Sequence, residues 1–237
     1  MSCTAIKPSN DRIRRTNDDP VFKKPRFRTT TTLVIPHKAE QLELRYHRSL
    51  WQSDRDVPGV HQRILQARLY VDGCHAGSFR LTEVRPEPLI ANDRFLEWAD
   101  MLSAEMSDLA ETICEHWVDV SEVSDFGTIL ELTRAWMSPR FSSGERFSLA
   151  ANALAALSAE WSLLVLKAFP LEYESRVTEM NIVARKRRQK AMMRHYRSTL
   201  GVEPFPEEAG DEGWMYLIGT GLPIARPQRG SRLQCWD

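Results

Sequence analysis

Apolar and polar positions alternate along the first third of the chain and recur with helical spacing further on. Partial alternation with β-branched residues predicts strands over residues 31–50. A clearer alternation surrounds Asp72-Gly73, a dipeptide that supplies the positive φ angles of a tight turn. The chain therefore predicts an antiparallel hairpin with strands at about 64–71 and 74–84.

The next pattern is helical. After Pro86 and Pro88, apolar residues recur every three or four positions from Phe95 to Trp117. This stripe predicts one long amphipathic helix over about 92–117, with Asn92 or Asp93 as its N-cap. We interpret the stripe as core and the acidic outer face as solvated.

The middle of the chain, residues 129–173, predicts a strand, a turn, a helix and a second strand. Residues 129–137 alternate, residues 147–161 carry apolar positions at helical spacing, and the run SLLVLKAF is typical of a strand buried on both sides. A crossover of this length predicts that the two strands run parallel. The turn leads into a helix start, where free backbone N–H groups favour phosphate.

The last third predicts a basic helix over about 183–200 with Gly201 as its C-cap, and a closing strand in the segment GWMYLIGT. These elements predict a single α/β domain over residues 31–220. We expect a flexible basic tail at 1–30 and a C-terminal tail at 221–237.

Composition and charge narrow the possible classes of protein. The 237 residues carry 32 Lys and Arg against 32 Asp and Glu, so the net charge favours no polyanionic partner. Basic residues gather in the first 28 residues and again over 185–197, but few aromatic residues are interleaved with them, which argues against nucleic acid as a partner. The four cysteines form no CxxC pair, and no apolar run reaches the length of a membrane span. We therefore expect a soluble cytoplasmic protein without a metal site.

Three short segments, in this order of elements, resemble the GNAT superfamily of N-acetyltransferases. Met137-Ser138-Pro139-Arg140-Phe141 is similar to the family's strand-ending V-x-P-x-Y/F pattern. The segment LKAFPL, residues 166–171, resembles a subgroup whose fifth strand ends in Pro-Phe-Pro-Leu, and residues 196–202 resemble Y-x-x-L-G-F. The resemblance covers about 64–220. It implies a mixed, mostly antiparallel central sheet flanked by helices, with the unit 129–169 at its centre.

The resemblance also implies a binding site for acetyl-CoA as co-substrate. By position, the backbone of Trp136 and Met137 would pair with the pantetheine, between two parallel strands that splay apart. The turn at the helix start would face the pyrophosphate through Arg140, Ser142, Ser143, Gly144, Glu145 and Arg146. This turn departs from the family's Arg/Gln-x-x-Gly-x-Gly/Ala pattern, since it holds one glycine and an anionic Glu145.

Carried over by position, Tyr196 would be the general acid that protonates the leaving thiolate, and Glu131 could be the general base. A packed tyrosine and a solvent-facing strand glutamate are the structural alternatives. The basic run from Arg185 to Lys190 would contact the coenzyme's 3′-phosphate or an acidic substrate, or simply be solvated.

Three interpretations of function stay open at this point. The resemblance implies an acyl-CoA-dependent N-acyltransferase acting on a small-molecule or protein amine. The substituted turn instead favours a catalytically inert GNAT-fold module that binds or regulates. A nucleic-acid-associated protein is a third interpretation, based on the two basic segments.

Overall fold

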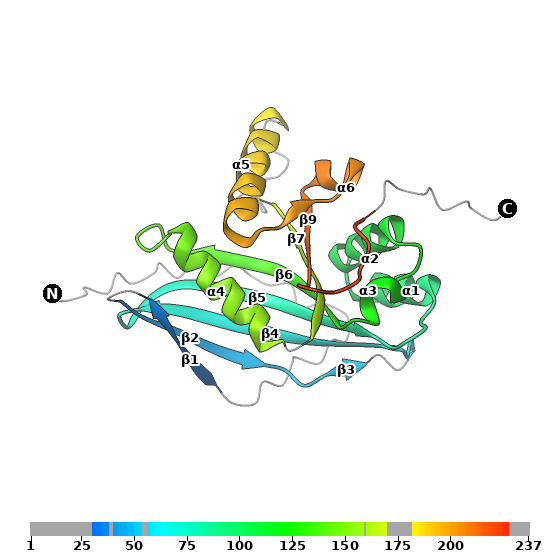
Figure 1. The fold of residues 1–237 in the computed structure, drawn as a ribbon, viewed down its shortest axis with the longest axis horizontal. Helices are drawn as coiled ribbons and strands as arrows, with labels where there is room; N and C mark the ends of the chain where they lie inside the picture. The colour runs from blue at the N-terminus through cyan, green and yellow to red at the C-terminus, as the bar shows by residue number, and fades with distance from the viewer. Residues whose placement is uncertain (1–29, 38–39, 54–55, 159, 170–181, 228–237) are drawn as a thin grey trace, which may run out of the picture.

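The protein is built on one open nine-stranded sheet (Figure 1). The computed structural model describes residues 30–37, 40–53, 56–158, 160–169 and 182–227. The strand order is β1-β2-β4-β5-β6-β7-β9-β8, with β3 paired to β4. Within the described chain only β6 and β7 pair in parallel, and the other pairs are antiparallel. The predicted class, α/β with a mixed and mostly antiparallel sheet, is therefore confirmed.

The strands are β1 (Thr31–His37), β2 (Glu40–Arg48), β3 (Gln52–Ser53), β4 (Val60–Val71), β5 (Cys74–Pro86), β6 (Thr128–Met137), β7 (Trp161–Lys167), β8 (Glu203–Pro204) and β9 (Trp214–Ile218). The helices are α1 (Asn92–Leu102), α2 (Ala104–His116), α3 (Ser121–Ser124), α4 (Gly144–Leu157), α5 (Ile182–Leu200) and α6 (Glu207–Glu212). Several predicted segments lie outside the described residues. They are positions 1–29 of the N-terminal tail predicted over 1–30, Pro170-Leu171 of the LKAFPL motif, the loop before α5, and residues 228–237.

Two hydrophobic cores occupy the two faces of the sheet. One forms between the strands and α4, where Leu65, Phe79 and Leu130 pack with Phe147 and Leu154. The other joins α1, α2 and α3 to the opposite face through residues such as Val60, Val84, Ile129, Trp98 and Ile113. Helices α1 to α3 gather at one end of the sheet (Figure 1). Because strand residues alternate between the two faces, β4, β5, β6, β7 and β9 each contribute to both cores.

The hairpin, the strand-helix-strand unit and the basic helix form close to their predicted positions. Asp72 and Gly73 adopt φ angles of 48° and 76°, as a tight turn between β4 and β5 requires. Gly201 follows α5 with a φ of 74°, and its N–H donates to the carbonyl of Arg197.

The single helix predicted over 92–117 is wrong, because Ser103 divides it into α1 and α2. Ser103 is extended, and its hydroxyl accepts the Met106 N–H at 3.1 Å, which caps α2. The predicted cap at Asn92 or Asp93 is also wrong, since Ala91 takes that place without a side-chain bond. The Asn92 side chain instead bonds the backbone of Val118 and Val120 beyond α2. The apolar stripe continues across the break, so its period could not reveal it.

The start of the predicted C-terminal tail packs on the core. Ile224 is buried in the core of α1 to α3, and the indole N–H of Trp117 donates to the carbonyl of Ala225 at 3.0 Å. Residues 221–227 therefore close one end of the domain.

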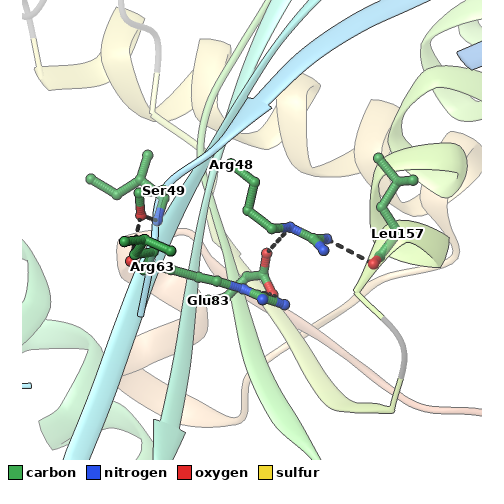
Figure 2. Close-up of polar contacts among 7 residues, drawn as sticks. Arg48, Ser49, Arg63, Glu83 and Leu157 are labelled. Atoms are coloured by element: carbon green, nitrogen blue, oxygen red, sulfur yellow. Dashed lines mark hydrogen bonds and ion pairs between the residues drawn. The ribbon is translucent and has the colours of Figure 1, made fainter. Parts of the chain in front are cut away.

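A buried ion cluster ties β2, β4, β5 and α4 together (Figure 2). Glu83 on β5 has no exposed surface. One of its carboxylate oxygens accepts two hydrogen bonds from the Arg63 guanidinium of β4, at 2.6 Å and 2.8 Å. The Arg48 Nε lies 3.2 Å from the other carboxylate oxygen as an ion pair without hydrogen-bond geometry. Arg48 also donates to the carbonyl of Leu157 at the end of α4 at 2.7 Å. Burial lowers the pKa of Arg48 more than Glu83 raises it.

Because of this cluster, we expect Glu83→Gln to lower the free energy of unfolding substantially. This change leaves two partly buried guanidinium groups without their counter-charge, and breaking a buried pair in this way costs about 3 kcal/mol. Urea unfolding at pH 7 should show this loss. The matched variant Glu97→Gln, which breaks an exposed pair with Arg94, should cost less than about 0.5 kcal/mol. Equal midpoints for the two variants would contradict a stabilising role for the cluster.

Candidate functional site

The site begins where β6 and β7 separate. They pair in parallel only from Thr128 to Glu131 on β6 and from Trp161 to Val165 on β7. Beyond this point β6 stays paired with β5 as far as Met137, and β7 stays paired with β9 as far as Lys167. Figure 1 shows the two strands diverging, with α5 above the opening. The inner edge of β6 after Glu131 therefore has no strand partner within the described sheet.

A cavity of about 740 Å³ fills this opening. Its walls come from the diverging ends of β6 and β7, the start of α2, the inner side of α5, and α6. They include Glu131, Thr133, Arg134, Lys167, Tyr196 and Glu105. Five elements that are distant in sequence thus meet at the end of the β6–β7 ladder.

A β-bulge in β6 orients the side chains of this strand. Leu132 pairs with Leu81 and Arg134 pairs with Arg80, so Thr133 has no partner on β5. The extra residue shifts the alternation by one position, so Arg134 lies on the same face as Glu131 and not on the opposite one. The Thr133 hydroxyl donates to Glu131 at 3.4 Å and lies 3.1 Å from the hydroxyl of Thr82.

Glu131 stands at the vertex of the opening with a shifted acidity. Its side chain is 3% exposed. Burial, and next the negative charge of Glu105, raise the pKa of Glu131 to about 7, against the opposing effects of Thr133, Arg80 and Thr82. A carboxyl group with this pKa exchanges its proton near neutral pH, as a general base requires. The structural alternative, a solvent-facing strand glutamate, is wrong.

The cavity wall also contains Lys167, which is paired with acidic side chains, and Tyr196, which stacks on a phenylalanine ring. Lys167 lies 3.1 Å from Asp108 and 3.6 Å from Glu212, and its ammonium group lies 4.9 Å from the ring centre of Trp214. Tyr196 on α5 lines the same cavity, and its ring stacks on that of Phe147 at 5.8 Å. The structure therefore brings both predicted catalytic residues, Glu131 and Tyr196, to one cavity.

The start of α4, which the resemblance assigns to the pyrophosphate, has partners within the protein. Ser143 is the N-cap and accepts the N–H of Arg146 at 3.2 Å. The guanidinium of Arg146 makes a two-pronged pair with Glu40 of β2, with one N–O distance of 2.9 Å. A third donor of Arg146 bonds the carbonyl of Phe141. Both polar side chains therefore hold the turn in place.

The other predicted coenzyme contacts lie outside the cavity wall. Ser142 bonds the carbonyl of Pro139, and Arg140 is exposed over the ring of Phe141. Glu145 is 3.8 Å from His37. A side chain at Gly144 would stand 2.9 Å from Thr199, so this glycine permits the contact between α4 and α5.

Trp136 and Met137 lie on the part of β6 beyond Glu131, which pairs with β5 and has no strand partner on the β7 side among the described residues. The residues that sequence reasoning missed are Glu105, Asp108, Arg134 and Lys167. Glu105 and Asp108 lie on the helix face that the apolar stripe marked as solvated. No local pattern indicated that this face would meet β6 and β7.

Comparisons with protein-family models, curated proteins and solved structures find no match to this chain. Among the described residues, none of the helices combines the length and the apolar character that a membrane span requires. In the same part of the chain, no group of three or more His, Cys, Asp or Glu residues is placed to hold a metal ion.

The shifted acidity of Glu131 predicts a pH-dependent gain in stability for Glu131→Gln. The folded pKa of about 7 lies above the ordinary value of 4.5, so wild-type stability is greatest below pH 4.5 and falls as the pH rises through 7. The Glu131→Gln variant has no ionisable group at this position, so its stability does not fall with pH for this reason. Relative to wild type it should gain about 2–3 kcal/mol between pH 5 and pH 8. Denaturant unfolding at both values measures the difference, and Glu97→Gln should show no such gain.

Proposed function

We propose that the protein is an acyl-CoA-dependent N-acyltransferase of the GNAT type, which transfers an acetyl group to an amine. One observation carries the proposal: β6 and β7 pair in parallel and then open around a cavity with buried Glu131 at its vertex. The sequence resemblance implies such a pair of splayed strands at this position.

The edge of β6 suits the amide-containing arm of the coenzyme. From Leu132 to Met137 the strand has backbone donors and acceptors on the side that β7 has left. An extended chain of amides can pair with such an edge as an added strand would. The thioester would then lie near the vertex, within reach of Glu131.

In this mechanism Glu131 is the general base and Tyr196 is the general acid. Glu131 takes the proton of the acceptor amine, whose nitrogen forms a bond to the thioester carbonyl carbon. The carbon–sulfur bond breaks, and the Tyr196 hydroxyl gives its proton to the thiolate. A phenol and a thiol have ordinary pKa values near 10 and 8.5, close enough for this transfer.

Charged residues at the cavity supply sites for phosphate. Arg185 and Lys186 on α5 line it, which supports the interpretation of the basic run as a contact for the coenzyme's phosphates. Backbone N–H groups at the start of α4 remain the other candidate for the pyrophosphate.

A catalytically inert GNAT-fold binding module is the second candidate, and one observation favours it. The groups expected to meet the pyrophosphate, Ser143 and Arg146, bond within the protein instead, and Glu40 neutralises Arg146. A chain that no longer binds coenzyme would tolerate this arrangement.

Coenzyme binding and Tyr196→Phe separate the two candidates. Calorimetry with acetyl-CoA should give saturable heat, and its absence at millimolar coenzyme would eliminate the enzyme. Tyr196→Phe should then lower turnover with a general amine acceptor by about 100-fold without much loss of coenzyme affinity. Tyr46→Phe, which removes a hydroxyl outside the cavity wall, should leave turnover unchanged. Equal turnover in the two variants would remove Tyr196 from the mechanism.

The same mechanism predicts a pH profile set by Glu131. Turnover per bound acceptor should rise with pH and level off above about 7, because only ionised Glu131 accepts a proton. Glu131→Gln should flatten this rise and lower the plateau by about 100-fold or more. An unchanged profile in Glu131→Gln would assign the titration to the acceptor itself.

A further inference from the structure

A second cavity, of about 720 Å³, lies over strands β2, β4, β5 and β6. Among the described residues, its lining includes four arginines, Arg45, Arg68, Arg80 and Arg134, and no Asp or Glu. Tyr70 and Trp136 line it as well. We call these six residues the basic sheet face. By strand alternation they lie on the face of the sheet that forms the core with α1 to α3, because their chain neighbours Leu44, Leu69 and Leu81 are buried in the core with α4.

Arginine stands opposite arginine twice on this face. Arg45 pairs with Arg68 across β2 and β4, and Arg80 pairs with Arg134 across β5 and β6. Like charges directly opposite each other destabilise a sheet. Glu43 bonds Arg45 at 2.9 Å, and the positive charge of Arg80 lowers the pKa of Glu131, so part of this repulsion is offset within the protein. The Arg80 Nε is buried and has no hydrogen-bond partner among the described residues. An anionic ligand would add a counter-charge beside four guanidinium groups that line one cavity.

Aromatic rings lie among these charges. Trp136 is 50% exposed. The ring of His75 stacks against it, with 5.8 Å between the ring centres. Tyr70 lies under the guanidinium of Arg45 at 4.3 Å. A half-exposed indole beside guanidinium groups suits a ligand that carries planar rings as well as negative charge.

The geometry also sets the length of the ligand. The two arginine pairs span three strand spacings, roughly 14 Å at about 4.8 Å each. A single phosphate group cannot reach both pairs, whereas a chain of phosphates can. Thr30, the first described residue, also lines this cavity.

We propose that the basic sheet face binds single-stranded nucleic acid, with its phosphates on the arginine pairs and a base stacked on Trp136. The sequence argued against such a partner because its basic segments lack interleaved aromatics. The residues of this face are far apart in the sequence and become neighbours only through strand pairing. The proposal does not depend on acyl transfer.

Fluorescence anisotropy of the full chain with labelled dT12 and U12 tests the proposal. At 50 mM salt, at least one of the two oligonucleotides should bind with a micromolar Kd. Tighter binding of dT12 would identify DNA as the ligand, and tighter binding of U12 would identify RNA. Affinity should fall with salt, by a log-log slope of about 0.7 for each phosphate contact. A duplex of the same length should bind more weakly, because its bases cannot stack on Trp136.

Two variants separate the phosphate contacts from the stacking contact. Arg68→Gln should weaken binding about fivefold to tenfold and reduce the salt slope by about 0.7. Its Tm should stay equal to that of wild type or rise, because it also relieves the repulsion with Arg45. Trp136→Ala should weaken binding by at least fivefold with an unchanged salt slope.

Arg85→Gln is the matched control. Arg85 is an exposed arginine on the same strand as Arg80, and by alternation it lies on the other face. Its loss should change affinity less than twofold. The proposal is overturned if neither oligonucleotide binds at 50 μM protein, or if Arg85→Gln weakens binding as much as Arg68→Gln. Competition by polyglutamate as strong as that by dT12 would also overturn it, in favour of an acidic protein partner.

Discussion

The two edges of strand β6 have different partners, and the arrangement of the protein follows from this difference. One edge pairs with β5 along the strand, while the other pairs with β7 only as far as Glu131. Since β7 and β6 each keep their outer neighbours, the sheet can open between them without losing the strands on either side. Helices α2 and α5 then meet at the opening, which brings residues from both halves of the chain into one cavity.

The opening has an energetic cost, which the surrounding structure must offset. A carboxyl group at 3% exposure is costly to ionise, and Glu105 adds to this cost. The large cores on both faces of the sheet and the cluster around Glu83 hold β2, β4 and β5 rigidly behind β6. A strand fixed in this way can keep an unfavourable residue in place.

The local patterns of the sequence were sufficient to predict most elements, because each depends on neighbours in the chain. Asp72-Gly73 forms its turn from its own backbone preferences, and Gly201 ends α5 for the same reason. The break at Ser103 was missed because a serine inside an apolar stripe also fits a continuous helix. Its cap becomes evident only from the bond to Met106.

The candidate site was predictable only in part. Tyr196 and Glu131 were identified through the resemblance, but the raised pKa of Glu131 depends on its burial and on the charge of Glu105 from α2, and no pattern in β6 contains that information. The bulge at Thr133 had no signal either, although it decides on which face Arg134 lies. Contacts between distant segments, and not local preference, determine these features.

The two candidate anion sites differ in a way that gives a physical criterion for function. At the start of α4, Arg146 and Ser143 have partners that stabilise the folded chain whether or not a ligand binds. On the basic sheet face, arginine stands opposite arginine at two positions across neighbouring strands, an arrangement that a bound anion would make more favourable. Ligand binding is favoured most where it relieves such an unfavourable arrangement. By this criterion the sheet face, which has no counterpart in any local motif, is a stronger candidate for anion recognition than the helix start that the sequence indicated.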